Sequence, residues 1–369
     1  MRDRIKVLIV DDSLIFRSAL ERALKEEDDI QVVGSVRNGL KAVEFIKQAG
    51  EPPDVITLDL EMPEMDGLAT LRAIEELNLA KAVPARIGSI MVSAHTFRGA
   101  DSTIRALELG AFDFVTKPDG KDFEKNAELF RRGLTVKIRQ FALQRKKLDQ
   151  PDGCATAVAA PPPAARPAPP CHGVDAIVIG VSTGGPKALA GMLPELSKVA
   201  PLPVFIVQHM PPLFTTSLAG SLDSKCGHTV IEAKDGDRVA ADHIYIAPGG
   251  RHLAIQRREG GAVYTMLNDQ APENGCKPSV DILFRSAAAA YGGRVIAIVL
   301  TGMGCDGAKG LAPLKRAGAF VLAQDEASSV VWGMPGSAVA TGTVDEVQPL
   351  DRIPAAVKNV LLGRRSREN

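Results

Sequence analysis

The stretch VIGVSTGGPKAL, Val178–Leu189, decides what kind of fold its surroundings can form. It runs from an apolar segment of strand composition into a glycine-flanked Ser-Thr pair and then into the start of a helix. A strand, a tight turn and a helix in succession form the repeating unit of α/β proteins. The turn is suited either to holding a phosphate or to exposing Ser182 as a nucleophile, so the rest of the sequence must decide its use.

The sequence that follows this stretch repeats the same alternation. Apolar, strand-like runs occur in LPVFIVQHM, DHIYIAPG and RVIAIVLTGMG, and helix-like segments such as KPSVDILFRSAAAAY lie between them. Strands that alternate with helices indicate a parallel sheet enclosed by helical layers. We therefore predict a three-layer α/β domain with a mostly parallel sheet over residues 174–362.

The N-terminal part of the chain shows a second alternation of this kind. Its strand-like runs are KVLIV, QVVGSV, DVITLDL, SIMVSA and FDFVT, and helical patterns such as LIFRSALERALKEE separate them. This order predicts an α/β domain with a doubly wound, flavodoxin-like parallel sheet over residues 1–121. A chain of 369 residues is long enough for two such domains, each with its own core.

Residues 122–173 separate the two predicted domains. Within them, DFEKNAELFRRGLTVKIRQFALQRKKL carries apolar residues near helical spacing, which predicts an amphipathic connector helix. The next segment, PDGCATAVAAPPPAARPAPP, is rich in proline and alanine and cannot bury a core, so it predicts an extended linker.

Composition excludes several classes of protein. Lys plus Arg balances Asp plus Glu at 44 each, so the molecule lacks the basic field typical of nucleic-acid-binding proteins. The longest apolar runs have the length of strands, which predicts no membrane insertion. The N-terminal segment MRDRIKVLIVDDS lacks the features of a secretory signal. We therefore expect a cytoplasmic protein. The five cysteines form no C-x-x-C pair, which favours reduced thiols over disulfides or a zinc site of the usual spacing.

Polar side chains follow the predicted strands of the first domain. They are Asp11 and Asp12, Asp59, Ser93 and Lys117. Each alone would be an ordinary surface residue, but the carboxyl ends of parallel strands meet at one edge of a sheet. Three converging carboxylates repel one another unless a cation is present, which favours a hard ion such as Mg²⁺. With the metal and the lysine neutralising a phosphoryl group, one carboxylate could attack phosphorus.

These residues, together with MPEMDG after the central strand, resemble the receiver domain of two-component response regulators over about residues 5–120. The resemblance implies phosphorylation by a histidine kinase in the presence of Mg²⁺. It also implies a role for each matching residue: Asp59 as phospho-acceptor, Asp11 and Asp12 as the acidic pair with Asp12 a direct metal ligand, the Glu61 backbone carbonyl as a further ligand, Ser93 as the hydroxyl that follows the phosphoryl group, and Lys117 as its cationic partner.

The glycine-rich turn of the second domain does not fit a nucleotide-binding motif. A P-loop requires lysine where Pro186 stands and a hydroxyl residue after it, and the dinucleotide fingerprint requires glycine where Ser182 stands. Gly180 to Gly184 does match G-x-S-x-G, a turn that exposes a nucleophilic serine. Alone, the motif is equally compatible with a structural glycine turn.

A nucleophilic serine needs a base and a group that orients the base. His209 ends the apolar strand VFIVQHM, and Asp306 follows a third apolar strand within a glycine-rich loop. Each has an ordinary alternative, as a hydrogen-bonded histidine or a turn aspartate, but three strands ending in Ser, His and Asp predict a hydrolytic triad. This chain order differs from that of α/β-hydrolases, and backbone N–H groups of the Gly302–Gly304 loop are candidates for an oxyanion hole.

Six segments together resemble the catalytic domain of the chemotaxis protein-glutamate methylesterase family over residues 174 to about 350: GVSTGGPKAL, VQHMPPLFTTSLAGSLD, YIAPGGRHL, KPSVDILFRSAA, VLTGMGCDGAKGL and AQDEASSVVWGMPGSA. The resemblance implies Ser182 as nucleophile, His209 as general base and acid, and Asp306 as its orienter, with Thr183 and the Met303 backbone lining the site. It also implies two substrates on chemoreceptors: methylated glutamates, which are hydrolysed to glutamate and methanol, and glutamines, which are deamidated to glutamate. It implies no cofactor for the esterase.

A receiver fused to a hydrolase predicts a switch in which the unphosphorylated receiver blocks the triad and phosphorylation at Asp59 relieves the block. The alternative is a response regulator whose second domain binds a partner or DNA without chemistry. A DNA-binding domain of that kind carries a helix-turn-helix with a basic recognition helix, and the sequence shows neither.

Overall fold

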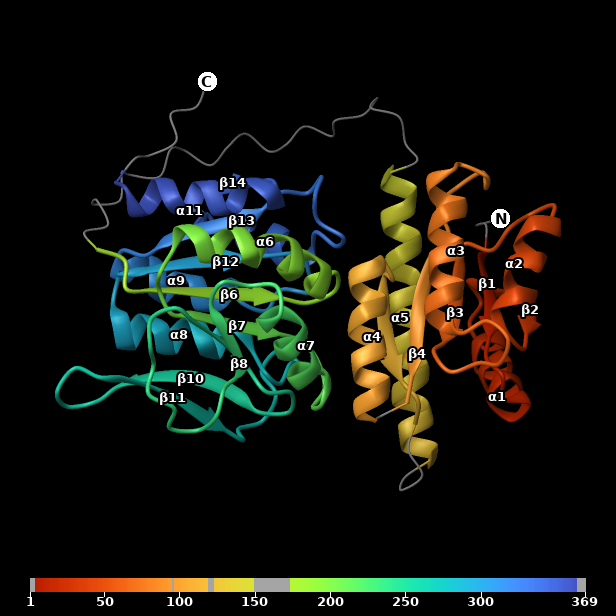
Figure 1. Ribbon diagram of the computed structural model, residues 1–369, viewed down its shortest axis with the longest axis horizontal. Coiled ribbons are helices and arrows are strands. Elements are labelled where there is room, and N and C mark those ends of the chain that lie inside the picture. The colour runs from red at the N-terminus through yellow and green to blue at the C-terminus, as the bar shows by residue number, and fades with distance from the viewer. Residues whose placement is uncertain (1–3, 95, 119–122, 149–172, 364–369) are drawn as a thin grey trace. The chain divides into compact units, whose positions relative to one another are not determined.

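The computed structural model describes residues 4–94, 96–118, 123–148 and 173–363, without the side chains of residues 123–125 and 147–148. Figure 1 shows the chain as a ribbon. It divides into two compact units, Met1–Ala155 and Thr156–Asn369. Each unit is an α/β structure with its own sheet, as the sequence predicts.

The first unit is a doubly wound sheet with strand order β2-β1-β3-β4-β5 and only parallel pairs. Helix α1 packs against α5, and α3 packs against α2 and α4, so helices cover both faces. The order reverses between β1 and β3, where open sheets of this kind bind ligands. The elements are β1 Ile5–Val10, α1 Leu14–Lys25, β2 Ile30–Val36, α2 Gly39–Gln48, β3 Val55–Asp59, α3 Gly67–Leu79, β4 Gly88–Ser93, α4 Phe97–Leu109, β5 Asp113–Thr116 and α5 Phe123–Leu148.

Helix α5, predicted as a connector, packs onto the first unit. Its apolar stripe is buried through Leu134, Ile138 and Phe141, and the helix contacts α1 and four strands of the sheet. Arg139 pairs with Asp29 at 2.7 Å and adds a charged contact at the rim of this packing. The amphipathic pattern is confirmed, but the packing of the first unit continues past residue 121. The expected Pro/Ala-rich linker falls in residues 149–172, outside the described residues.

The second unit has a sheet of order β14-β13-β12-β6-β7-β9-β8 in which every pair is parallel. A separate antiparallel hairpin, β10 with β11, packs through β10 against α8. The elements are β6 Ala176–Val181, α6 Gly185–Val199, β7 Val204–Gln208, α7 Phe214–Asp223, β8 Thr229–Glu232, β9 His243–Ile246, β10 His252–Arg257, β11 Val263–Asn268, α8 Val280–Tyr291, β12 Val295–Val299, α9 Ala308–Ala317, β13 Phe320–Gln324, α10 Gly333–Ala340, β14 Glu346–Gln348, a short 3₁₀ helix Leu350–Arg352 and α11 Ile353–Leu361.

The core of the second unit lies on both faces of its central strands. Every residue of β6, β7 and β12 is buried. Alternate residues such as Val178, Val207 and Ala297 share one apolar cluster with α8 and α9, so the residues between them are buried on the opposite face. Helices α6, α7 and α11 pack together as the other helical layer (Figure 1). The predicted three-layer architecture is confirmed.

Two expectations from composition concern the described part of the chain. None of its helices is long and apolar enough to cross a membrane. The cysteines whose positions are described, Cys226, Cys276 and Cys305, are all free thiols.

Candidate active site

The G-x-S-x-G motif forms a turn between β6 and α6. Ser182 directly follows the buried strand β6 and is partly exposed. Gly184 has φ of 81°, a left-handed conformation that favours glycine, and it forms the N-cap of α6. A Cβ at Gly180 would lie 2.4 Å from Val280 Cγ1, so this position also requires glycine. The predicted strand-turn-helix arrangement is therefore present.

Parallel pairing brings the ends of three strands together around Ser182. Strand β6 lies between β7 and β12, and Val181 pairs with Gln208. The His209 N–H donates to the Val181 carbonyl at 3.1 Å, and the Ser182 N–H donates to the Thr301 carbonyl at 3.0 Å. Ser182 and His209 are therefore adjacent strand-end residues, with the loop after β12 on the other side of the serine.

The loop after β12 passes close to Ser182. A Cβ at Gly302 would lie 2.8 Å from the Ser182 Cβ, so only glycine allows this approach of the backbone. The partly buried Met303 follows it in the chain. Thr183 is buried, and its carbonyl accepts a hydrogen bond from Thr301 Oγ1 at 3.0 Å. Backbone groups of Gly302 and Thr183 are thus held beside the serine.

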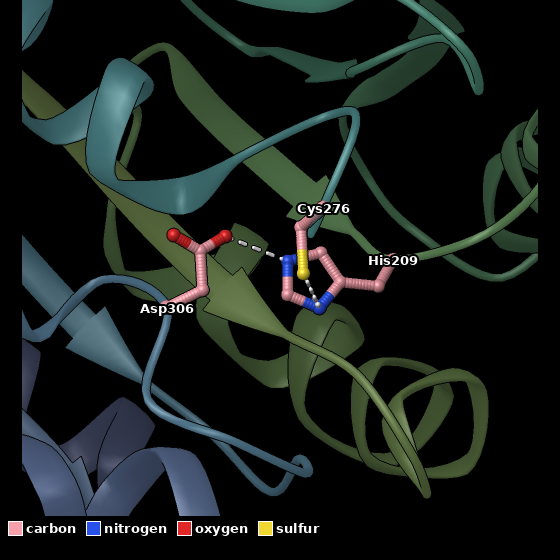
Figure 2. Close-up of side chains that lie close together, drawn as sticks. All are labelled: His209, Cys276 and Asp306. Atoms are coloured by element: carbon pink, nitrogen blue, oxygen red, sulfur yellow. Dashed lines mark hydrogen bonds and ion pairs between the residues drawn. The ribbon is translucent and has the colours of Figure 1, made fainter. Parts of the chain in front are cut away.

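The partly buried His209 and the buried Asp306 form a hydrogen-bonded pair. The His209 Nε2–H donates to Asp306 Oδ2 at 2.8 Å, as Figure 2 shows. The Asp306 carboxylate also accepts from the Ser279 hydroxyl at 2.8 Å and the Val280 N–H at 2.7 Å, at the N-terminus of α8. These donors fix the carboxylate, and the carboxylate in turn fixes the imidazole with Nδ1 turned away from it.

The two members of this pair shift each other's pKa in opposite directions. Burial opposes the ionisation of Asp306, but hydrogen bonds from His209, Val280 and Ser279 outweigh it and lower its pKa to about 2. Burial also opposes protonation of His209, yet the Asp306 carboxylate and the neighbouring Cys276 raise its pKa to about 9. The site therefore stabilises an imidazolium, the species formed when a histidine takes the proton of a nucleophile.

Sequence reasoning missed Cys276. Its Sγ lies 3.7 Å from His209 Nδ1, the nitrogen that does not face Asp306 (Figure 2). The cysteine comes from the loop between β11 and α8, which is 67 residues from His209 in the chain. Spacing rules for cysteine pairs could not reveal this contact. The available signal was that its segment, NGCKPS, leads directly into the helix that holds Asp306.

The polar residues predicted in the first unit also converge. Lys117 Nζ lies 2.7 Å from Asp11 Oδ2 and 2.8 Å from Asp59 Oδ2. Carboxylate oxygens of Asp11, Asp12 and Asp59 all lie within 4.8 Å of one another. Burial and the charge of Asp11 raise the pKa of Asp59 to about 6, although Lys117 acts in the opposite direction. An all-oxygen donor set of this charge fits a hard divalent cation such as Mg²⁺.

The remaining predicted residues of the first unit lie at the same sheet edge. Ser93 ends β4, is fully buried, and accepts through its carbonyl the Lys117 N–H at 2.8 Å. Glu61 lies just beyond β3 with an exposed side chain, 3.9 Å from Arg98 Nε. An exposed Glu61 side chain is compatible with the predicted role of its backbone carbonyl.

Comparisons with known proteins agree with this two-part organisation. Residues 7–127 match the response regulator receiver domain family, and residues 177–357 match the CheB methylesterase family. The crystal structure of the Thermotoga maritima CheB methylesterase catalytic domain covers 51% of this chain and 100% of its own, with 42% identity and a TM-score of 0.49.

Relatives align over nearly the whole chain. A Rhodospirillum centenum protein named protein-glutamate methylesterase/protein-glutamine glutaminase of group 2 operon is 39% identical, covering 98% of this chain and 95% of the relative. A Burkholderia lata protein named protein-glutamate methylesterase/protein-glutamine glutaminase 3 is 45% identical, covering 94% and 93%. At this identity and coverage, the chain belongs to the protein-glutamate methylesterase/protein-glutamine glutaminase (CheB) family, in which a receiver domain precedes the methylesterase domain.

Proposed function

We propose that this protein is a phosphorylation-activated serine hydrolase that demethylates glutamate methyl esters on chemoreceptors and deamidates receptor glutamines to glutamate. The observation that carries the proposal is the hydrogen-bonded, largely buried His209–Asp306 pair, with Ser182 next to His209 at the strand ends. We assign the chemistry to residues 174–362 and its control to the receiver, residues 1–121. The protein works in the cytoplasm, without binding nucleic acid or inserting into a membrane.

The proposed reaction follows the serine hydrolase scheme. Because Nε2 of His209 is bonded to Asp306, Nδ1 of the neutral imidazole is the nitrogen that accepts the proton of Ser182 Oγ. The serine oxygen attacks the ester carbonyl, and the histidine then gives its proton to the departing methoxide, which leaves as methanol. Water, activated by the same nitrogen, cleaves the acyl-enzyme and releases the glutamate carboxylate. Ammonia replaces methanol as the leaving group when the substrate is a glutamine.

The loop after β12 supplies the proposed oxyanion hole. Gly302 lies against Ser182, Met303 is the next residue of that loop, and Thr183 directly follows the serine. Backbone N–H groups fixed beside the nucleophile stabilise the negative oxygen of the tetrahedral intermediate by a few kcal/mol for each donor. The esterase itself needs no cofactor in this scheme.

The proposed control begins at Asp59. Its carboxylate attacks a phosphoryl group delivered by a chemotaxis histidine kinase, and Asp11, Asp12, Asp59 and the Glu61 carbonyl would hold Mg²⁺. Bound Mg²⁺ neutralises charge on the transferring phosphoryl group. Lys117 pairs with the phosphoryl oxygens, and the Ser93 hydroxyl bonds to one of them. Relief of a block on the triad is the predicted consequence.

Replacing Asp59 with asparagine should abolish phosphoryl labelling of the protein by a radiolabelled small phosphodonor in Mg²⁺, because the amide cannot attack phosphorus. Labelling of the intact protein, followed by hydroxylamine cleavage of the acyl phosphate, measures this directly. Glu61→Gln is the matched control: it keeps the backbone carbonyl and should label normally. Labelling of Asp59→Asn at the rate of the unmodified protein would disprove the assignment.

A further inference from the structure

The contact between Cys276 and His209 does not belong to the hydrolytic scheme. The Cys276 side chain is partly buried, and His209 keeps 14% of its side-chain surface exposed, so a small ion can reach both. A thiol is a weak hydrogen-bond donor, and 3.7 Å from Sγ to Nδ1 is a long contact for one. Thiol sulfur and imidazole nitrogen at this separation also form a pair of metal donors.

The separation fits tetrahedral zinc. With Zn–S of about 2.3 Å and Zn–N of about 2.0 Å, two ligands at a tetrahedral angle place sulfur and nitrogen about 3.5 Å apart. The observed Sγ to Nδ1 distance is 3.7 Å, so an ion could bind both atoms with a movement of a few tenths of an ångström.

Asp306 orients the imidazole ring of His209 for metal binding. Histidine ligands of metals commonly donate their other N–H to a carboxylate, which fixes the ring and its tautomer. His209 does this through Nε2 to Asp306 Oδ2 at 2.8 Å, which leaves Nδ1 facing Cys276 (Figure 2). The Asp306 carboxylate is itself committed to the N-terminus of α8, so it orients His209 rather than binding the ion.

We propose that Cys276 Sγ and His209 Nδ1 bind Zn²⁺, and that the bound ion inhibits the hydrolase. Binding displaces the protons that the thiol and Nδ1 carry, which are released to solvent, and water molecules complete the coordination. Thiolate and imidazole select zinc over Mg²⁺, whereas the all-oxygen cluster of Asp11, Asp12 and Asp59 favours the hard ion. The donor atoms therefore favour Zn²⁺ at Cys276 and His209 and Mg²⁺ at the carboxylate cluster.

The expected inhibition follows from binding of the ion to Nδ1 of His209. Nδ1 is the only nitrogen of His209 left to take the proton of Ser182, and a metal on its lone pair removes that base. This second half of the inference rests on the proposed function, whereas metal binding at Cys276 and His209 does not. General base catalysis contributes about 10²- to 10⁴-fold, so saturation should lower methanol release about a hundredfold or more.

The first test measures binding without activity. Co²⁺, a spectroscopic probe for zinc sites, is titrated into the full-length protein in excess Mg²⁺, and the thiolate-to-cobalt charge-transfer absorption is recorded. We expect a saturable band that Zn²⁺ displaces, that is lost in Cys276→Ala and His209→Gln, and that persists in Cys305→Ala, where an exposed thiol is removed instead. Absence of the band in the unmodified protein, or its persistence in Cys276→Ala, would overturn the site.

The second test measures methanol release with Zn²⁺ and after its removal by EDTA, each variant being compared with its own metal-free rate. We expect strong, reversible inhibition of the unmodified protein and of Cys305→Ala, and none of Cys276→Ala. Equal inhibition of Cys276→Ala would place the inhibitory zinc elsewhere. If the cobalt band depends on Cys276 but the metal-free protein releases no methanol, the metal site stands and the proposed function fails.

Discussion

Replacing Ser182 with alanine is expected to lower methanol release from methylated chemoreceptors by about 10⁴-fold or more, because the loss of the nucleophile leaves only binding and the oxyanion hole. Ser182 directly follows β6 and is partly exposed, so truncating its hydroxyl should leave the fold and its thermal unfolding unchanged. Release of methanol under single-turnover conditions measures the effect on the chemical step.

A matched control for this change is Ser337→Ala. Ser337 is a partly exposed serine of α10 whose hydroxyl donates to the Gly304 carbonyl at 3.3 Å, close to the same loop. It should keep activity within a few-fold of the unmodified protein. If Ser182→Ala kept a tenth of the original rate while folded, another residue would be the nucleophile.

Asp306→Asn should cost about 10⁴-fold in kcat with little change in KM, the second largest expected effect. The side-chain N–H₂ group of an asparagine can donate to His209 Nε2, so Nε2 becomes the acceptor. The imidazole proton then lies on Nδ1, the nitrogen that must receive the serine proton. Steady-state methanol release gives kcat and KM separately.

The control for Asp306→Asn is Asp269→Asn, which changes an exposed carboxylate paired with Arg251 at 3.1 Å. It should leave both constants near their original values. A rise in KM without loss of kcat in Asp306→Asn would show that Asp306 positions substrate and does not orient the base.

Strand-end reasoning predicted that most residues of the two candidate sites lie close together. It succeeded for Asp11, Asp59 and Lys117 because the carboxyl ends of β1, β3 and β5 meet at one edge of a parallel sheet, whatever the details of packing. It succeeded for Ser182 and His209 because their strands are neighbours in register.

Contacts that depend on tertiary packing were not predictable in the same way. Nothing in the sequence indicates that the loop before α8 folds back so that Cys276 meets His209, or that Ser279 caps the carboxylate of Asp306. The amphipathic pattern of α5 predicted one buried face but not its partner, which is the sheet of the first unit. Periodicity identifies a buried face, and only the folded chain shows what covers it.

The most direct test of the account is methanol release from membranes that carry methylated chemoreceptors, by the intact protein with and without a small phosphodonor and Mg²⁺. We predict methanol release that depends on Ser182 and that rises with the phosphodonor by about 5- to 150-fold. This range corresponds to a coupling free energy of about 1 to 3 kcal/mol between phosphorylation and activity. The Asp59→Asn variant should show no rise. No release under either condition, or release that the phosphodonor leaves unchanged, would contradict the account.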